Sequence, residues 1–442
     1  MAITEQTTDT RLSRGISGPL LYLFILGDVL GAGVYALVGV ISAEVGGAIW
    51  MPLMVALALA LLTAGSYAEL VTKYPKAGGA AVFAERVFRK PFISFLVGFC
   101  MLAAGVTSAA GLAQAFAGGY LTTFIDVPAV PAALVFLVLL ALLNMRGIKE
   151  SVRSNVVMTV IEVSGLVLVI VVVGIFLAGG NGDLSRVNDF PPGVSAASAV
   201  LAASLIAYYS FVGFEVSANV AEEVRDVSRV YPKAIFGALL TAGVVYLLIG
   251  LASSAALAPE ELAGSSSPLL DVVAATGACI PTWLFSLVAL IAVANGALLT
   301  MIMSSRLTYG MAEQGLFPSV FSRVLPRRRT PWVAIVATTL VAMVLSLTGG
   351  LESLASTVVL LLLFVFLSTN IAVIVLRKDR VEHQHFRIPA IFPYLAIASC
   401  VLLLTQQTGE IWLRTAVLLA VGLALYGVQK LVRGRTGAHT GS

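Results

Sequence analysis

The segment 21–40, LYLFILGDVLGAGVYALVGV, is apolar enough to cross a membrane as one helix but is interrupted near its middle. The interruption consists of three glycines and a charged residue: Gly27, Asp28, Gly31 and Gly33. The segment 205–224, LIAYYSFVGFEVSANVAEEV, has Gly213 and the charged Glu215 in a comparable place. A break inside a membrane leaves backbone N–H and C=O groups that lipid cannot satisfy, so they must face a cavity. Two interrupted helices in the two halves of a chain therefore indicate the binding site of a transporter.

Close packing of helices against glycine is the alternative explanation for either segment taken alone. Two breaks at corresponding positions, each beside an acidic residue, favour the cavity. Free N–H groups at a helix start suit a carboxylate, whereas free carbonyl groups suit an ammonium group. The two segments therefore predict a site that accepts both kinds of charge.

The composition of the 442 residues indicates a polytopic membrane protein. Hydrophobic residues make up 59%, charged residues only 11%, and the mean hydropathy is +0.99. Soluble proteins have about 25% charged residues, so a soluble enzyme is excluded, and so is a disordered chain. Apolar runs of about 20 residues mark candidate spans. They predict twelve spans, at 18–42, 48–71, 92–124, 130–145, 155–178, 196–220, 234–257, 281–311, 332–347, 355–376, 389–405 and 411–429.

The basic residues indicate how the chain is oriented. With a cytoplasmic N-terminus, all of the 27 Lys and Arg residues except Arg186 and Arg414 fall in cytoplasmic segments, as the positive-inside rule requires. Both termini are therefore predicted to be cytoplasmic, and the protein to lie in the cytoplasmic (plasma) membrane. Because the basic residues are spread over many loops, membrane lipid is a predicted partner and nucleic acid is not. The sequence does not identify a protein partner.

The predicted spans divide into two five-helix repeats with additions at the end. The predicted units are a cytoplasmic tail (1–17), a first repeat (18–178), a second repeat (196–376), helices 11 and 12 (389–429) and a second cytoplasmic tail (430–442). Since five is an odd number, the two repeats begin on opposite sides of the membrane and are inverted relative to each other.

The cysteines and histidines give no sign of a metal or redox centre. Cys100, Cys279 and Cys400 are far apart in or beside apolar segments, and the histidines lie in polar segments, at His383, His385 and His439. This spacing predicts neither a disulfide framework nor a zinc site. The GxxxxGK[ST] loop of nucleotide-hydrolysing proteins is absent from the sequence as well. We therefore predict no metal, no cofactor and no catalytic residues, and so no enzyme.

Five motifs resemble those of the amino acid–polyamine–organocation (APC) superfamily, and most of all its cationic amino acid transporter-like branch. In chain order they are GDVLGAGVYALVG (27–39), YAELVTKYPKAGGA (67–80), NMRGIKESVRSN (144–155), FVGFEVSANVAEEV (211–224) and SSRLTYGMAEQGLFP (304–318). The resemblance runs from about residue 14 to at least residue 320. It implies a LeuT-type fold, with a five-plus-five inverted repeat, two further helices, and unwound helices 1 and 6. It also implies amino acid transport driven by protons or by exchange.

The same resemblance places the substrate on the backbone of the two breaks. It puts the carboxylate on the N–H groups of Gly31, Ala32 and Gly33. It puts the α-amine on carbonyl oxygens of four residues, Val29, Tyr209, Ser210 and Val212. Glycine permits this close approach. Because main-chain contacts read the part common to all amino acids, they predict the substrate class and not its side chain.

Asp28 stands where the superfamily usually has a neutral residue. A carboxylate inside a span costs about 2.5–3.5 kcal/mol on insertion scales and usually marks an ion or substrate path. We predict that Asp28 holds a cationic group, such as a substrate amine or guanidinium. The alternative is a hydrogen bond to the unwound backbone that stabilises the break.

Glu162 stands where the proton-coupled branch typically has a lysine, and the resemblance places Asn295 close to it. A carboxylate with no basic residue near it in sequence has few routes to neutralisation except protonation. We therefore predict that Glu162 and Asn295 couple transport to protons. The alternatives are a structural hydrogen bond and a site for sodium.

Three further side chains are predicted to act around the site or at a helix end. Glu215 is predicted to gate the site or to join the helices, and Phe211, with Tyr209, to form an aromatic gate. Glu69 is expected to have a solvated or a topology-related role at the cytoplasmic end of its helix.

The sequence thus predicts a secondary active amino acid transporter that works by alternating access, with proton symport as the mode of coupling. The alternatives are a polyamine or other amine carrier, an amino acid exchanger and a non-transporting nutrient sensor.

Overall fold

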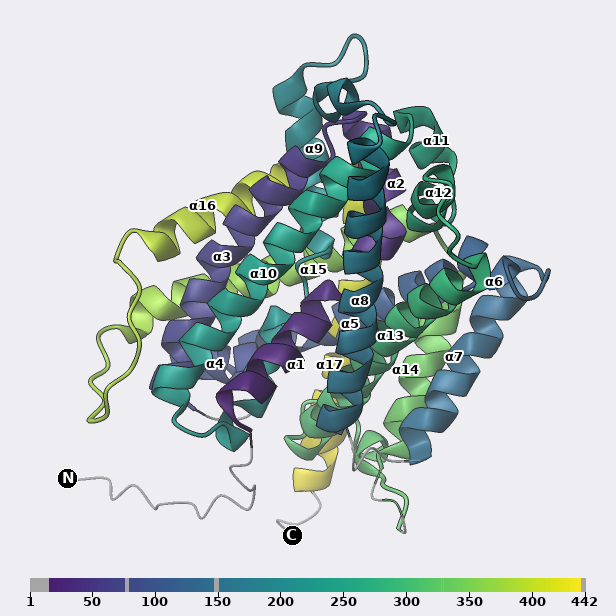
Figure 1. Cartoon of the computed structure of the whole chain (residues 1–442). Helices are drawn as coiled ribbons and strands as arrows, with labels where there is room; N and C mark the ends of the chain where they lie inside the picture. The colour runs from purple at the N-terminus through teal and green to yellow at the C-terminus, as the bar shows by residue number, and fades with distance from the viewer. Residues whose placement is uncertain (1–15, 76–78, 147–150, 327, 329, 439–442) are drawn as a thin grey trace.

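A computed structural model describes residues 16–75, 79–146, 151–326, 328 and 330–438. Within these ranges the long elements are all helices, and they form one bundle (Figure 1). The two predicted tails are described only in part, and His439 lies outside the described residues. The all-helical fold class predicted from the composition is confirmed.

Seventeen α-helices and three short 3₁₀ helices follow one another along the described chain. The first half contains α1 (Gly18–Leu30), α2 (Ala32–Val45), α3 (Trp50–Lys73), α4 (Gly79–Phe88), α5 (Pro91–Phe116), α6 (Gly119–Thr122), α7 (Ala129–Arg146), α8 (Ser151–Ala178) and η1 (Leu184–Asn188). The second half contains α9 (Ala196–Tyr209), η2 (Phe214–Glu223), α10 (Val227–Ala256), α11 (Pro259–Gly264), α12 (Pro268–Ala275), α13 (Thr282–Glu313), η3 (Ser319–Ser322), α14 (Trp332–Ser346), α15 (Leu351–Leu376), α16 (Phe392–Thr405) and α17 (Gly409–Ala438).

Ten helical regions of the described chain are long and apolar enough to cross a membrane. Each coincides with a predicted span to within seven residues at either end. The other two predicted spans form shorter helices, α14 with 15 residues and α16 with 14. At about 1.5 Å per residue, the longer of the two reaches about 23 Å, less than the roughly 30 Å of a bilayer core. The protein is therefore a multi-pass membrane protein, and the described part of it has ten clear candidate spans.

The centre and the rim of the bundle differ in what covers them. α5 packs against both α13 and α15 and is mostly buried. α8 and α17 are mostly exposed, and their outward side chains are large and apolar, such as Ile175 and Leu413, each about two thirds exposed. Such a surface suits lipid and not water. The start of α1 and the end of α17 lie on the same side of the bundle (Figure 1).

The end of α3 is held by the segment that follows α15. Glu69 is buried and accepts hydrogen bonds from Arg377 at 2.8 and 2.7 Å. The N–H of Ile388 donates to the same carboxylate at 3.1 Å. Lys73 is also buried and donates to main-chain oxygens of this segment. The expectation that Glu69 is solvated is therefore wrong, because its partner Arg377 lies 308 positions later in the sequence.

Candidate functional site

Both helices are interrupted where their glycines predict it. α1 ends at Leu30, and α2 begins two residues later, with Gly31 between them at φ −39° and ψ −156°. α9 ends at Tyr209, and the chain resumes as η2 after Gly213, which has φ +126°. Only glycine adopts such a φ readily, so Gly213 is required for the second break.

The two breaks lie directly against each other. A methyl group on Gly213 would lie 2.8 Å from the main-chain oxygen of Asp28, and one on Gly33 would lie 2.9 Å from the Cα of Ser210. Gly31 is different, since the nearest atoms to its missing methyl group belong to the preceding turn of its own helix, 3.5 Å away. Gly33 and Gly213 therefore permit close backbone contact, whereas a methyl group on Gly31 would make only ordinary van der Waals contacts.

Tyr246 of α10 joins the two breaks. Its hydroxyl lies 2.6 Å from the main-chain oxygen of Val29 and 3.0 Å from that of Ser210. These are two of the carbonyl groups predicted to receive the substrate amine. A hydroxyl has one proton to donate, so Tyr246 donates fully to only one of the two oxygens at any moment. Nothing in the local sequence around Tyr246 indicates this contact.

At the other end of α1 the two interrupted helices are also connected. Ile16, just before α1, donates its N–H to the main-chain oxygen of Glu223 at 3.0 Å, and its own oxygen accepts from Arg225 at 3.0 Å. The chain entering the first break and the chain leaving the second are thus linked by backbone hydrogen bonds.

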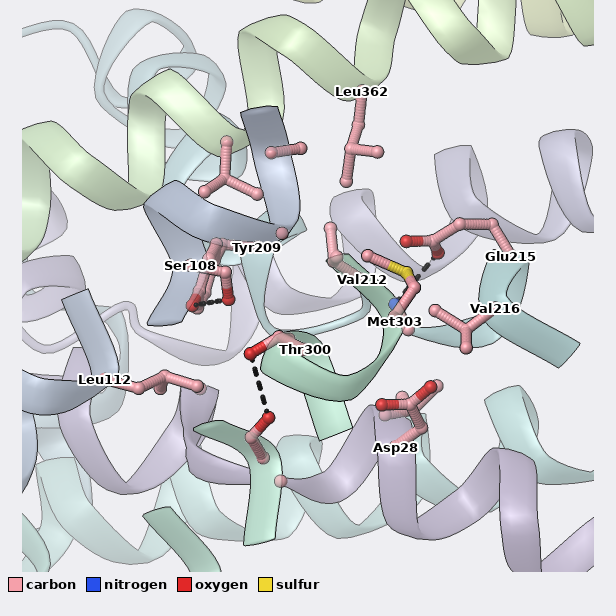
Figure 2. Close-up of a pocket in the computed structure, with 18 of the residues that line it drawn as sticks. Asp28, Ser108, Leu112, Tyr209, Val212, Glu215, Val216, Thr300, Met303 and Leu362 are labelled. Atoms are coloured by element: carbon pink, nitrogen blue, oxygen red, sulfur yellow. Dashed lines mark hydrogen bonds between the residues drawn. The ribbon is translucent and has the colours of Figure 1, made fainter. Parts of the chain in front are cut away.

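A cavity opens beside the breaks, between α1, α5, α13 and α15 (Figure 2). Many of the predicted site residues line it: Asp28, Val29, Gly31, Gly33, Tyr209, Ser210, Val212 and Glu215. Three predicted residues, Phe211, Glu162 and Asn295, are not part of the lining. Residues of α5, α13 and α15 form much of the remaining lining, and the sequence analysis did not identify them. Their signal in the sequence is weak, because apolar residues in spans are the rule.

The two carboxylates of the cavity differ in their partners. Glu215 accepts a hydrogen bond from the N–H of Gly213 at 2.9 Å and so caps the second break. Asp28 has a buried Oδ2 atom with no hydrogen-bond partner in the described part of the chain. Glu215 therefore makes a local contact within the second break, whereas Asp28 has an unpartnered carboxylate oxygen among the described residues.

Glu162 lies behind the first break and is fully buried. Its Oε1 accepts from the side-chain amide of Asn295 at 3.0 Å, and the same amide donates to Asn155 at 3.1 Å. Its Oε2 has no partner among the residues described. Tyr35 of α2 donates to the main-chain oxygen of Glu162 at 2.8 Å. The structure thus brings Glu162 and Asn295 together and adds Asn155, which the sequence analysis did not single out.

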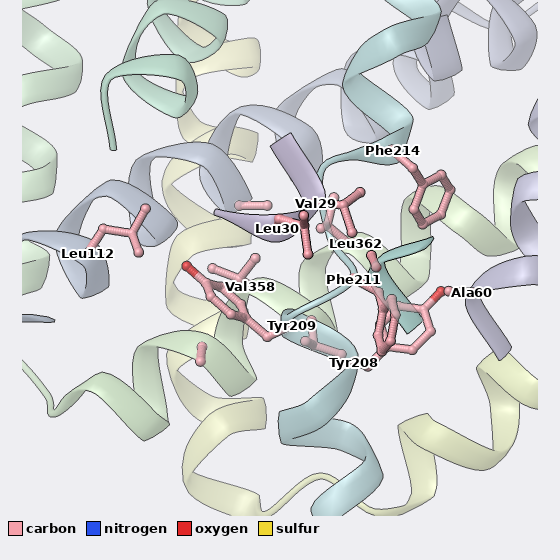
Figure 3. Packing of buried hydrophobic residues seen from close by; sticks show 14 of the residues in the cluster. Val29, Leu30, Ala60, Leu112, Tyr208, Tyr209, Phe211, Phe214, Val358 and Leu362 are labelled. Carbon is pink, nitrogen blue, oxygen red and sulfur yellow. The ribbon is translucent and has the colours of Figure 1, made fainter. Parts of the chain in front are cut away.

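The two aromatic residues predicted to gate the site point in different directions. Tyr209 lines the cavity, and its hydroxyl lies 2.8 Å from that of Ser108. Phe211 is fully buried, with its ring centroid 5.1 Å from that of Tyr246. Figure 3 shows Tyr209 next to Val358, whereas Phe211 points away from them. Phe211 therefore supports the tyrosine that joins the breaks.

Residues 17–420 match the amino acid permease family. The chain belongs to this family. It is thus a membrane transport protein of the APC superfamily and not an enzyme, as the motifs indicated. The match extends over nearly all of the predicted spans of this permease, well beyond the motifs themselves.

Individual relatives of the permease agree with this assignment. The branched-chain amino acid permease BcaP of Bacillus subtilis is 25% identical over 96% of this chain and 94% of its own length. The methylthioribose transporter of the same organism is 25% identical over 96% of this chain and 95% of its own length. The vacuolar cationic amino acid transporter 4 of Arabidopsis thaliana is 29% identical over 83% of this chain and 64% of its own length.

Proposed function

We propose that the chain is a secondary active transporter that moves amino acids across the cytoplasmic membrane by alternating access, with both termini in the cytoplasm. The observation that carries this proposal is the contact between two interrupted helices beside a cavity, which is where transporters of this kind bind their substrate. We propose the LeuT-type arrangement, with repeats at 18–178 and 196–376 and helices at 389–429. In it α14 and α16 complete twelve crossings, and short helices accommodate this by thinning the bilayer locally.

In this proposal the substrate's carboxylate binds at the start of α2. The N–H groups of Gly31, Ala32 and Gly33 lie in the first turn of that helix, where backbone donors have no partner within the helix. The positive end of the helix dipole also favours an anion there. Gly31 lines the cavity and has no side chain, so a carboxylate can approach this turn closely.

The substrate's ammonium group binds where the preceding helices end. The main-chain oxygens of Val29, Tyr209, Ser210 and Val212 are the proposed acceptors, and the Asp28 carboxylate supplies the opposite charge. Tyr246 holds two of these oxygens in place, so the acceptors are fixed before the substrate arrives. Preorganised acceptors reduce the ordering cost of binding.

Proton symport is the proposed mode of coupling, with Glu162 as the group that carries the proton and Asn295 as its partner. A fully buried carboxylate with one amide donor and one unpartnered oxygen is costly when it is ionised. Binding a proton removes that charge. Tyr35 connects Glu162 to α2. A change in the charge of Glu162 therefore acts on the helix that begins at the first break.

The relatives support amino acids as the substrate class, since one is named for branched-chain and another for cationic amino acids. The methylthioribose transporter carries a different kind of molecule by its name, so similarity alone does not fix the substrate. The unpartnered oxygen of Asp28 favours an amine carrier as the second candidate.

Uptake into proteoliposomes tests the proposal. Purified protein in sodium-free liposomes should accumulate labelled amino acids when the outside is made more acidic, and should show counterflow when the inside is preloaded. Leu139→Ala is a matched control, because Leu139 is 53% exposed on the outer face of α7. Uptake of polyamines without amino acids, or no saturable uptake of either, would overturn the proposal.

A further inference from the structure

The cavity has two different ends. Figure 2 shows Asp28 and Glu215 on one side and Leu112, with the Ser108–Tyr209 pair, on the other. Two buried polar atoms of the lining have no partner within the described ranges, Oδ2 of Asp28 and Oγ of Ser210. Both belong to the breaks. Asp28, which carries the charged one of these two groups, lies at the end of the cavity opposite Leu112 (Figure 2).

The polar side chains toward the other end of the cavity are already hydrogen-bonded. The hydroxyl of Tyr209 lies 2.8 Å from that of Ser108, and the hydroxyl of Thr300 donates to the main-chain oxygen of Gly296 at 3.1 Å. The apolar residues that α5, α13 and α15 contribute to the lining are Met101, Ala104, Leu112, Met303, Val358 and Leu362. Of these, Leu112 lies on the Tyr209 side, whereas Met303 lies near Asp28 and Glu215 (Figure 2). A ligand group placed against these residues meets hydrocarbon, thioether and hydroxyls that are already engaged.

We propose that the substrates of this permease are amino acids with apolar side chains, and that residues of α5 and α15 set the size of side chain accepted. This inference rests on the proposed amino acid transport and narrows its substrate class. The α-ammonium group of the substrate binds Asp28 and the break carbonyls, and its side chain extends toward Leu112 and Val358. Asp28 thus recognises the amine common to all amino acids.

A cationic substrate side chain would not be stabilised in the apolar part of the cavity. An ammonium or guanidinium group there would be removed from water without an unpartnered acceptor, which costs several kcal/mol. Both acidic side chains of the cavity lie at the end with the breaks, where the α-ammonium group binds (Figure 2). Glu215 is, in addition, engaged with the N–H of Gly213.

Two positions on α5 allow the part of the cavity that receives the substrate's side chain to be enlarged or reduced. Leu112→Ala removes a branched side chain from the far end, and Ala104→Leu adds one to the same helix face two turns earlier. In an apolar pocket one methylene changes selectivity by roughly 10- to 200-fold. Leu112→Ala should therefore favour phenylalanine over leucine by at least about tenfold relative to the unchanged protein, and Ala104→Leu should favour alanine over leucine.

The experiment compares uptake of leucine, methionine, phenylalanine, alanine, lysine and arginine in proteoliposomes, with ligand-induced stabilisation of the purified protein as a second readout. Leu112→Val and Ala104→Val are milder variants that test the same trend if the larger changes reduce folding. Leu139→Ala, on the lipid-facing side of α7, should leave the ranking unchanged.

We expect leucine and methionine to be taken up in preference to lysine and arginine, and the two α5 variants to shift the preferred size in opposite directions. Preference for lysine or arginine would overturn this inference and leave amino acid transport standing, and so would uptake of leucine with no shift in either variant. Failure of every amino acid in both readouts would overturn the proposed function itself.

Discussion

Single residues in the breaks have separate roles, and glycine substitutions distinguish them. A methyl group on Gly31 enters the space proposed for the substrate carboxylate, so Gly31→Ala should lower affinity at least about tenfold, or about 1.4 kcal/mol. The melting temperature without ligand should change little. Binding measured by ligand-induced stabilisation checks this, and unchanged transport by Gly31→Val would contradict the backbone-binding site.

Gly33→Ala should behave differently, because its methyl group would lie 2.9 Å from the Cα of Ser210, a backbone atom that cannot turn aside. Overpacking of this kind typically costs about 1–3 kcal/mol. The variant should therefore melt at a lower temperature even without ligand. An unaltered melting temperature together with normal transport would show that the two breaks separate more easily than their contact suggests.

Asp28→Asn tests what the unpartnered carboxylate recognises. If Asp28 binds the α-ammonium group, the variant should weaken a neutral and a cationic amino acid by the same factor, since both carry that group. A larger loss for lysine, arginine or a polyamine would show that Asp28 binds a cationic side chain instead. The melting temperature without ligand separates both outcomes from a structural role, in which it would fall.

At the scale of helices, the attachment of α3 to the segment after α15 makes a prediction about stability. The hydrogen bonds from Arg377 to Glu69 hold the pKa of Arg377 above its usual value. The side chains are only 23% and 2% exposed, and breaking a buried pair by removing one partner costs about 3–5 kcal/mol. Glu69→Gln should therefore lower the melting temperature by several degrees.

The matched control for Glu69→Gln is an exposed ion pair. Arg229 and Asp226 are 3.9 Å apart, with side chains 84% and 59% exposed, and such pairs contribute little. Arg229→Ala should leave the melting temperature unchanged. Replacing both buried partners, as Glu69→Gln with Arg377→Met, should restore part of the loss, because no uncompensated buried charge remains. Equal effects of Glu69→Gln and Arg229→Ala on the melting temperature would show that the buried ion pair does not stabilise the fold.

Helices and their breaks could be predicted from the sequence because their causes are local. A run of apolar residues marks a span, and Gly31 and Gly213 mark interruptions within a few residues of where they occur. Contacts between distant helices could not be predicted. Tyr246 reaches Val29 across 217 positions, and Arg377 reaches Glu69 across 308. Such pairs are set by how helices pack, which a single sequence does not specify.

The lengths of α14 and α16 and the place of Phe211 have the same kind of explanation. The predicted run at 332–347 exceeds α14 by one residue, and the run at 389–405 begins three residues before α16, because hydropathy continues across residues that lie outside a helix. The two aromatic residues Tyr209 and Phe211 look equivalent in sequence. Their backbone lies at the end of α9, however, where the chain turns, so the two rings face opposite sides and only Tyr209 reaches the cavity.

At the scale of the whole molecule, the proposed proton coupling requires that protonation of one buried group change its interactions with the helices that move. Glu162 of α8 contacts Asn295 of α13 through its side chain and Tyr35 of α2 through its backbone. A proton on Glu162 therefore changes the charge at a point shared by three helices, two of which border the cavity. Glu162→Gln should keep the neutral form permanently: substrate still binds and exchanges, but an inward proton gradient no longer drives accumulation.

Two measurements on the same proteoliposomes decide this prediction. Counterflow without a gradient should be retained in Glu162→Gln within about threefold, since the polar contact with Asn295 is preserved by an amide of the same shape. Uphill uptake on a pH gradient in sodium-free buffer should be lost. The competing account is that ionised Glu162, Asn295 and the break carbonyls hold a sodium ion. Uptake that depends on sodium, or a Glu162→Gln variant that still concentrates substrate on a pH gradient, would exclude Glu162 from the proton path, because an amide cannot bind and release the proton that the mechanism requires.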